Sequence, residues 1–275
     1  MNPELRTHRF QFDNTTCIVL EEEHFTTDIS KEFDPILKSD ILTLCHSIDY
    51  PTQVEIGFNY LLLKTEDGNV LIDAGKGNGK LLDALALEDL KPDDIDYLVI
   101  THADNDHMGG IHSFPNSKIV MPKKCYDMWT SDVARNILIK DAYTTLVRLF
   151  PEDSMQRSNA SKEKYGAETL PSLQTRLLLV KDDEEFLPGL KMFPTPGHRG
   201  DHYCVEVKSG DEKMLVLADA VRHPFQLDHS AFSSLFDCHP EEWAQSIKRI
   251  NERDPRKKAL YFGTHISFPG LFSRK

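Results

Sequence analysis

A short apolar run that ends in a dense cluster of histidines and aspartates limits what this chain can be. Residues 97–100 (Tyr-Leu-Val-Ile) have the pattern of a strand that is buried on both faces. The next seven residues include His102, Asp104, Asp106 and His107. Two imidazoles and two carboxylates this close together repel or compete with each other unless a cation organises them. The cluster therefore predicts a metal site at the end of a strand.

Three more residues with metal-binding side chains follow apolar runs elsewhere in the chain. These residues are His198, Asp219 and His265. Because α/β folds place their sites at the carboxyl ends of strands on one edge of a sheet, we expect them to meet the first cluster. Each one alone is more commonly a polar residue at a strand end or a helix N-cap. The prediction therefore depends on all of them together.

Strand and helix patterns alternate along the chain, which predicts an α/β fold. Strands are expected at 60–64, 70–72, 97–100, 177–180, 191–193, 204–207, 214–217 and 260–262, and helices at 80–90 and 240–252. No linker divides this pattern, so we expect one domain over residues 1–275. Residues 132–150 have the pattern of an amphipathic helix and 151–170 that of a long polar loop, which predicts a lid or insertion around 132–170.

The composition favours a small-molecule substrate. The net charge is −12, whereas nucleic acids and anionic membrane surfaces bind basic patches, so neither is an expected partner.

The five cysteines are odd in number and show no C-x-x-C spacing, which is typical of reduced thiols in a cytoplasmic protein. The start of the chain has no signal-peptide pattern, and no apolar stretch is long enough to span a bilayer.

The histidine and aspartate cluster resembles the H-x-H-x-D-H signature of the metallo-β-lactamase superfamily. Gly-Gly follows it at 109–110, as is usual in that family. Further motifs occur in the family's order at 71–75 (Leu-Ile-Asp-Ala-Gly), 195–198 (Thr-Pro-Gly-His), 217–219 (Leu-Ala-Asp) and 263–265 (Gly-Thr-His). The resemblance implies the αβ/βα four-layer sandwich, in which two sheets lie face to face with helices outside.

The same resemblance implies roles for the individual residues and two divalent metal ions, zinc in the family. The first ion would be held by His102, Asp104 and His198, and the second by Asp106, His107 and His265, with Asp219 bridging both. Asp73 looks like the family's buried aspartate that orients ligands, so we expect it to be structural rather than catalytic.

Asp104 departs from this pattern, because the family usually has histidine at that position. Together with Asp106, Asp219 and a bridging hydroxide, it would cancel the charge of two divalent ions. A neutral site polarises a substrate less and raises the pKa of bound water. Carboxylate oxygens are also hard ligands, so Asp104 favours iron or manganese over zinc.

The expected chemistry is attack by a metal-bridging hydroxide on a carbonyl or phosphoryl centre, with Asp106 as the catalytic residue that steers water and carries its proton. The ending His-Ile-Ser-Phe-Pro-Gly at 265–270 looks like the H-x-x-F-P-G ending of lactonases and organophosphate hydrolases. We therefore expect hydrolysis of a lactone or another ester. The alternatives are a phosphodiesterase of the same fold, a diiron redox protein, or a non-catalytic ligand-binding protein.

The residues that bind the substrate are left open by the sequence. The aromatic candidates are Phe58, Trp129, Phe225, Phe232 and Phe268, although each one alone is more commonly an ordinary core residue. His223 either reaches the substrate or has a structural role. The segment 132–150 is a lid or, alternatively, a contact in a homodimer.

Overall fold

The computed structural model describes residues 5–133, 136–137, 140 and 173–274. The lid or insertion expected around 132–170 lies almost entirely outside these residues, as do most of the helix and all of the loop predicted within it. In the described part of the chain, no helix is long and apolar enough to cross a membrane.

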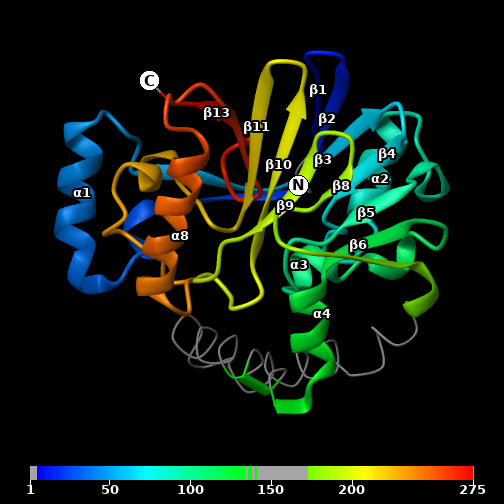
Figure 1. Ribbon diagram of the computed structural model, residues 1–275. Helices are drawn as coiled ribbons and strands as arrows, with labels where there is room; N and C mark the ends of the chain where they lie inside the picture. The colour runs from blue at the N-terminus through cyan, green and yellow to red at the C-terminus, as the bar shows by residue number, and fades with distance from the viewer. Residues whose placement is uncertain (1–4, 134–135, 138–139, 141–172, 275) are drawn as a thin grey trace.

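Two β-sheets form the centre of the described structure (Figure 1). The N-terminal sheet is antiparallel from its first to its fourth strand and parallel from the fourth to the seventh. Its strands lie in chain order: β1 (Thr7–Phe12), β2 (Thr15–Asp28), β3 (Gln53–Thr65), β4 (Gly68–Ile72), β5 (Tyr97–Val99), β6 (Lys118–Pro122) and β7 (Leu177–Val180).

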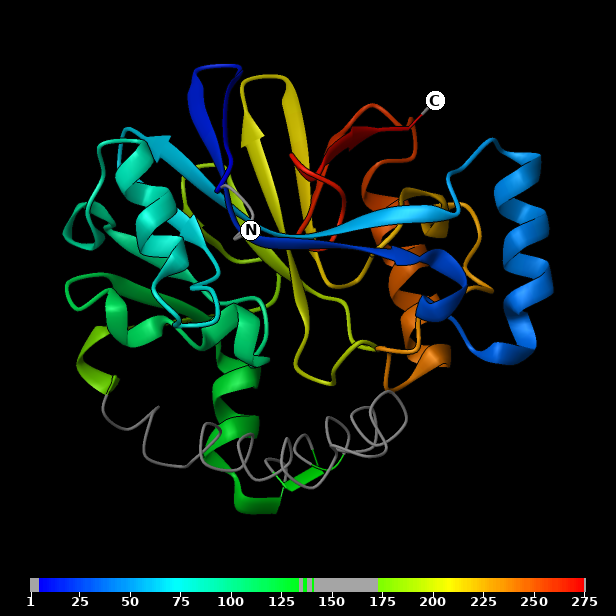
Figure 2. The same cartoon turned by 180° about the vertical axis from the view of Figure 1, so that it is seen from behind.

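The C-terminal sheet is mostly antiparallel, with one parallel pair between β11 and β12. Its order is β13 (Leu271–Ser273), β12 (Leu260–Gly263), β11 (Glu212–Ala218), β10 (Tyr203–Ser209), β9 (Leu190–Pro194) and β8 (Glu185–Leu187). The helices lie outside the two sheets (Figures 1 and 2): α1 (Lys38–Ser47), α2 (Lys80–Leu87), α3 (Asn105–Met108), α4 (Lys123–Thr130) and α8 (Pro240–Arg253).

Strand β11 shows why the layers pack in this order. Its alternate side chains point to opposite faces of the sheet. Met214 and Val216 belong to the core that the two sheets share, whereas Leu215 and Leu217 belong to a second core under α8. Helix α8 covers that outer face with Trp243, which is buried against the sheet. The two cores produce the four-layer sandwich that the sequence led us to expect.

Most of the predicted elements are present, but the sequence patterns did not single out β1, β2, α1, β6 or α4. Strand β2 is hidden in the sequence by the acidic run at 21–23. Glu21 and Glu22 are nevertheless both buried, because the pairing of β2 with β3 shifts register between residues 21 and 23. Arg6 pairs with Glu21, and the Tyr60 hydroxyl donates to Glu22 at 3.0 Å. Tertiary partners thus offset the cost of burying two carboxylates in this strand.

The first helix packs with the loop after β11 to form a third apolar core, and His223 packs against its member Phe225. This histidine is 1% exposed, and its ring stacks on Phe225 with centroids 5.5 Å apart. Its Nδ1 lies 3.3 Å from the hydroxyl of Tyr50. Burial lowers the pKa of His223 to about 4, so the ring stays neutral in the fold. These surroundings support a structural role for His223.

We predict that His223 makes the fold less stable in acid. The unfolded chain takes up a proton near the ordinary histidine pKa of 6.5, whereas the folded chain resists protonation until about pH 4. Stability is therefore lost as pH falls through this window, by on the order of 3 kcal/mol. Urea unfolding at pH 7 and pH 4 should show a smaller loss in His223→Phe than in the unsubstituted protein. Equal losses in both proteins would contradict the prediction.

Candidate metal centre

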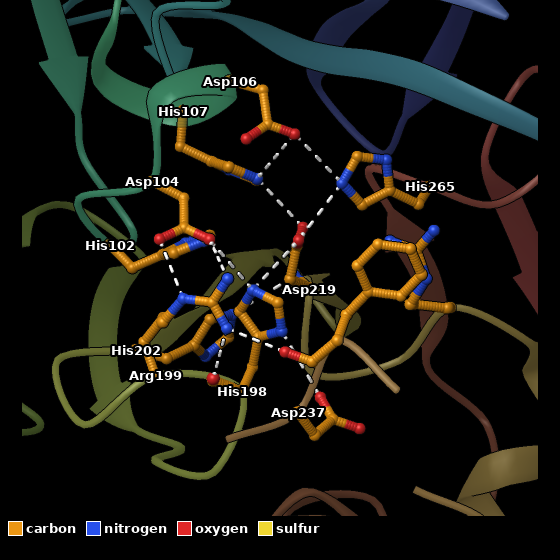
Figure 3. Close-up of polar contacts among 12 residues, drawn as sticks. His102, Asp104, Asp106, His107, His198, Arg199, His202, Asp219, Asp237 and His265 are labelled. Carbon is orange, nitrogen blue, oxygen red and sulfur yellow. Dashed lines mark hydrogen bonds and ion pairs between the residues drawn. The ribbon is translucent and has the colours of Figure 1, made fainter. Parts of the chain in front are cut away.

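Seven histidine and aspartate side chains converge at one edge of the sandwich (Figure 3). They come from both sheets, since each follows a strand end or begins a short helix there. His102 and Asp104 lie after β5, Asp106 and His107 lie in α3, and His198, Asp219 and His265 lie after β9, β11 and β12. The structure therefore brings together all the residues that the sequence singled out as candidate ligands.

One group of donor atoms comprises His102, Asp104 and His198. Asp104 Oδ2 lies 3.8 Å from His102 Nε2 and 3.4 Å from His198 Nε2. All three donor atoms lie within 4.8 Å of one another. The two imidazoles are buried, while the Asp104 side chain is 16% exposed. This spacing suits a single ion held between the three side chains.

A second group comprises Asp106, His107 and His265. Asp106 Oδ2 lies 3.3 Å from His265 Nε2 and 3.9 Å from His107 Nε2. Asp219 lies between the two groups. Its Oδ1 is 3.0 Å from His107 Nε2, and its Oδ2 is 3.4 Å from His198 Nε2. One carboxylate thus faces both groups, as a bridging ligand must.

Each of the four imidazoles is held from behind through its Nδ1 atom, which leaves Nε2 facing the cluster. His107 Nδ1 lies 2.8 Å from Asp73 Oδ2, and His198 Nδ1 lies 3.3 Å from Asp237 Oδ1. A carboxylate only accepts, so the proton sits on Nδ1 and the lone pair of Nε2 points inward. His265 Nδ1 donates to the carbonyl of Gly57 at 2.9 Å, with the same result.

Asp73 organises the loop that carries the first ligands. It directly follows β4 and has a φ of 66°, a left-handed backbone conformation that aspartate tolerates better than most residues. Its Oδ1 accepts from the backbone N–H of Thr101 at 2.8 Å, and the Thr101 hydroxyl also donates to it. That hydroxyl oxygen lies 3.1 Å from His102 Nδ1 and can accept a hydrogen bond from the Nδ1–H group. Asp73 therefore orients His107 directly and His102 through Thr101.

The donor set fits two divalent cations. In the described part of the chain, His102 Nε2, His107 Nε2 and Asp219 Oδ1 are buried without a hydrogen-bond partner. Such atoms cost free energy unless something satisfies them. Imidazole nitrogens and carboxylate oxygens in this arrangement are the ligands that zinc, iron and manganese accept in proteins. A cation in each group would satisfy these atoms.

The electrostatics of the cluster also require positive charge. Burial raises the pKa of Asp106, but the neighbouring His107 and His265 outweigh burial and hold it well below its usual range. Burial likewise lowers the pKa of His107, but Asp219 and Asp73 outweigh it and raise that pKa well above the ordinary value. The carboxylates therefore stay ionised and attract positive charge to the centre of the cluster, either a proton on His107 Nε2 or a metal ion that takes the place of that proton.

Comparison with known proteins agrees with this geometry. The family model of the metallo-beta-lactamase superfamily matches residues 55–265. The chain belongs to this superfamily. The match includes Asp73 and all seven residues of the cluster, and it confirms both the resemblance found in the sequence and the expected fold. This superfamily member is a metal-dependent hydrolase.

Several known proteins are similar to this superfamily member over most of its length. The N-acyl homoserine lactonase AiiA of Bacillus thuringiensis subsp. kurstaki is 25% identical over 232 residues, which cover 74% of this chain and 79% of AiiA. AidC, a dizinc quorum-quenching lactonase in complex with the product N-hexanoyl-L-homoserine, superimposes with a TM-score of 0.78 at 21% identity, covering 98% of this chain and 94% of AidC. The hydrolase AbOPH gives a TM-score of 0.78 at 19% identity, covering 97% and 92%. These structures share the fold.

The structure corrects the charge that the sequence suggested for the metal site. Arg199 Nε donates to Asp104 Oδ1 at 2.9 Å, and a second guanidinium nitrogen lies 2.7 Å from Asp104 Oδ2. The positive charge of Arg199 cancels the negative charge of Asp104, so Asp104 does not make the site neutral as we expected from the sequence. The sequence signal was Arg199 itself, which directly follows His198.

Two further positioning residues were not predicted. Asp237 lies behind His198, as described above. His202 lies behind Asp219, whose backbone N–H donates to His202 Nε2 at 3.2 Å, while His202 Nδ1 lies 2.8 Å from the Thr195 hydroxyl. Burial lowers the pKa of His202 to about 3, so it stays neutral and keeps Nε2 free to accept. No sequence motif marked either residue.

The aromatic residues proposed from the sequence lie in different places. The ring of Phe58 meets that of His265 edge-on, with centroids 4.8 Å apart. Trp129 is buried and donates its indole N–H to a buried carboxylate, and Phe225 belongs to the core around α1. Phe58 is therefore the candidate whose ring lies directly against the metal centre.

We predict that Asp237→Asn weakens the first metal site, whereas Asp73→Asn weakens the second site directly and the first site less, through Thr101 and His102. In each variant, the new amide N–H₂ would donate to the Nδ1 atom of His107 or His198 and force the proton onto Nε2. An imidazole protonated at Nε2 cannot bind a metal, so affinity at that site should fall about 10- to 100-fold.

Chelator competition with Co(II) absorbance measures the two affinities separately. Asp237→Asn serves as the comparison that acts on one site, since Asp237 is bonded to His198 of the first group, whereas Asp73 reaches His107 directly and His102 through Thr101. Unchanged affinities at both sites in both variants would show that these aspartates do not orient the ligands.

Proposed function

We propose that this protein is a dinuclear metal-dependent hydrolase that opens the ring of N-acyl lactones. The proposal depends above all on one observation. Four imidazole Nε2 atoms and three carboxylates from both sheets face one another, and two divalent cations would satisfy those of their atoms that are buried without a partner in the described residues.

In this proposal the two groups of donor atoms are the two metal sites. His102, Asp104 and His198 bind the first ion, and Asp106, His107 and His265 bind the second, with Asp219 bridging both. The distances of 3.0 to 3.9 Å between neighbouring donor atoms support this assignment. Asp73 orients two of these imidazoles and takes no direct part in the reaction.

When bound, such ions supply Lewis-acid activation of water and of the scissile carbonyl. Asp106 is the residue of this chain that handles the proton. Its side chain is 25% exposed, whereas that of Asp219 is 4% exposed, so Asp106 lies on the side of the cluster that a substrate reaches. It accepts a proton from the attacking water and donates it to the leaving alkoxide as the ring opens.

The substrate class is proposed from several observations together. AiiA and AidC, whose names describe them as lactonases, resemble this chain over most of their length. The net charge of −12 favours a small, uncharged substrate over a nucleic acid or a membrane surface. The half-buried ring of Phe58 meets His265 edge-on and places an aromatic side chain beside the metal centre, with Lys76 Nζ over the ring at 3.3 Å from its centroid. The cytoplasmic location and the homodimer stay predictions.

We propose zinc as the metal in both sites. AidC is a dizinc enzyme of the same fold, and the pairing of Asp104 with Arg199 removes the charge argument for other metals. The oxygen ligand of Asp104 is the argument for the alternative metals, iron or manganese. Elemental analysis of protein expressed without added metal distinguishes these metals.

We predict that the zinc-loaded protein hydrolyses N-hexanoyl homoserine lactone and releases one proton per turnover. A pH indicator follows the reaction, and an aryl ester, paraoxon and bis-p-nitrophenyl phosphate serve as the comparison panel. Asp106→Asn removes the proton carrier and should lower kcat by roughly 10²- to 10⁴-fold. The exposed Asp127→Asn is the matched control and should leave kcat unchanged.

The same panel identifies the outcomes that contradict the proposal. Cleavage of the phosphodiester without any lactone would support a phosphodiesterase instead. A metal-loaded protein that turns over none of the four would support a ligand-binding role.

A further inference from the structure

The carboxylate of Asp104 forms an ion pair with the guanidinium of Arg199 (Figure 3). Arg199 Nε donates to Oδ1 at 2.9 Å, and its NH2 nitrogen lies 2.7 Å from Oδ2. Both oxygens are therefore engaged in the forked geometry that arginine makes with carboxylates. This pair stands where the superfamily usually has a single histidine.

Arg199 is itself fixed in place. Its side chain is 9% exposed, and its NH1 nitrogen donates to the backbone carbonyls of His198 and Phe236, both at 2.7 Å. The same nitrogen lies 3.3 Å from the sulfur of Cys238. A guanidinium with this many bonds cannot swing away, so the direction of the Asp104 carboxylate is fixed as well.

The fork still leaves Asp104 able to bind a metal through one oxygen. Each carboxylate oxygen has two lone pairs. Oδ2 uses one for Arg199, while the other side of the atom faces the cluster, 3.4 Å from His198 Nε2 and 3.8 Å from His102 Nε2. Oδ1 accepts from Arg199 Nε, and it is Oδ2 that lies close to the two imidazoles, so Asp104 offers the cluster one donor atom, as an imidazole does.

The net charge of the Asp104 and Arg199 pair also equals that of a histidine ligand. A carboxylate and a guanidinium sum to zero, which is the charge of a neutral imidazole. The pKa of Asp104 is consistent with this pairing, since burial would raise it but Arg199 outweighs burial and holds it low. The pair thus adds an oxygen donor to the first group without adding net charge.

We propose that Asp104 and Arg199 act as one neutral, single-donor unit at the first metal site, with Arg199 as the residue that positions the ligand and balances its charge. This inference rests on the proposed function only in assuming that the cluster binds two ions. It follows that Arg199 lowers the metal affinity of the first site when Asp104 is removed. The buried guanidinium would then repel a cation at the neighbouring site, because the Asp104 carboxylate no longer offsets its charge.

A double-substitution cycle tests the proposal through zinc binding alone. Asp104→His restores the superfamily's usual ligand but removes the carboxylate that lies against Arg199, so first-site affinity should fall by roughly 100-fold or more. Asp104→His combined with Arg199→Gln should recover two ions with an affinity within about tenfold of the unsubstituted protein. Arg199→Gln alone keeps the Asp104 donor but loses the fork that fixes it, so two ions should still bind with an altered Co(II) spectrum at the first site. Arg199→Lys keeps the charge but not the fork and should alter the same spectrum.

Chelator competition gives the affinities, Co(II) absorbance reports the ligand set, and circular dichroism checks that each variant is folded. Tight binding of two ions by Asp104→His, or a double variant as weak as Asp104→His, would overturn the proposal. If the unsubstituted protein itself binds fewer than two ions, the proposed function fails instead. Metal affinities and the Co(II) spectrum decide whether Arg199 balances the charge of Asp104 and positions it, and lactonase activity is not used for this decision.

Discussion

Buried negative charge at the meeting edge of the two sheets is the constraint on which the rest of this structure depends. Asp219 and the imidazoles around it are buried, and several of their polar atoms have no protein partner in the described residues. His102 and His107 belong to the N-terminal sheet, whereas His198 and His265 belong to the C-terminal sheet. Ions bound between them would hold the sheets together, so metal binding and docking of the sheets are energetically linked.

The precision of the site comes from the residues behind the ligands. Asp73 and Asp237 fix the directions of ligand imidazoles through hydrogen bonds to their Nδ1 atoms, and His202 accepts from the backbone N–H of Asp219. Asp73 does so from a left-handed backbone position at the end of β4. Because a ligand lone pair must point within a narrow range of angles, these bonds matter as much as the ligands themselves.

Asp104 illustrates how a change in one ligand is absorbed by a neighbour. Considered alone, it adds a negative charge to a site that already has two carboxylates. The positive charge of Arg199 offsets this negative charge, and its bond to Oδ1 leaves Oδ2 as the oxygen that Asp104 offers to a metal ion. Two residues therefore occupy the place of one histidine, and neither can be interpreted without the other.

The sequence by itself determined the family, the order of the strands that carry ligands, and the identity of the seven ligands that we propose. These signals are local, because an apolar run followed by histidine or aspartate, as at 97–107, is visible within a few residues. Strand β2 escaped because its acidic run looks exposed, and only Arg6, Tyr60 and a shift in register make its burial tolerable.

Only the tertiary structure decided the charge and orientation of the site. Asp237 lies 39 positions from His198 and carries no motif, and the pairing of Arg199 with Asp104 joins residues 95 positions apart. Hydrogen bonds and ion pairs depend on distance in space. Residues that are far apart in the sequence become neighbours only when the chain between them folds back, so their spacing in the sequence does not reveal the contact. The sequence therefore names the atoms that can bind a metal, while the fold decides where their lone pairs point and which charges offset them.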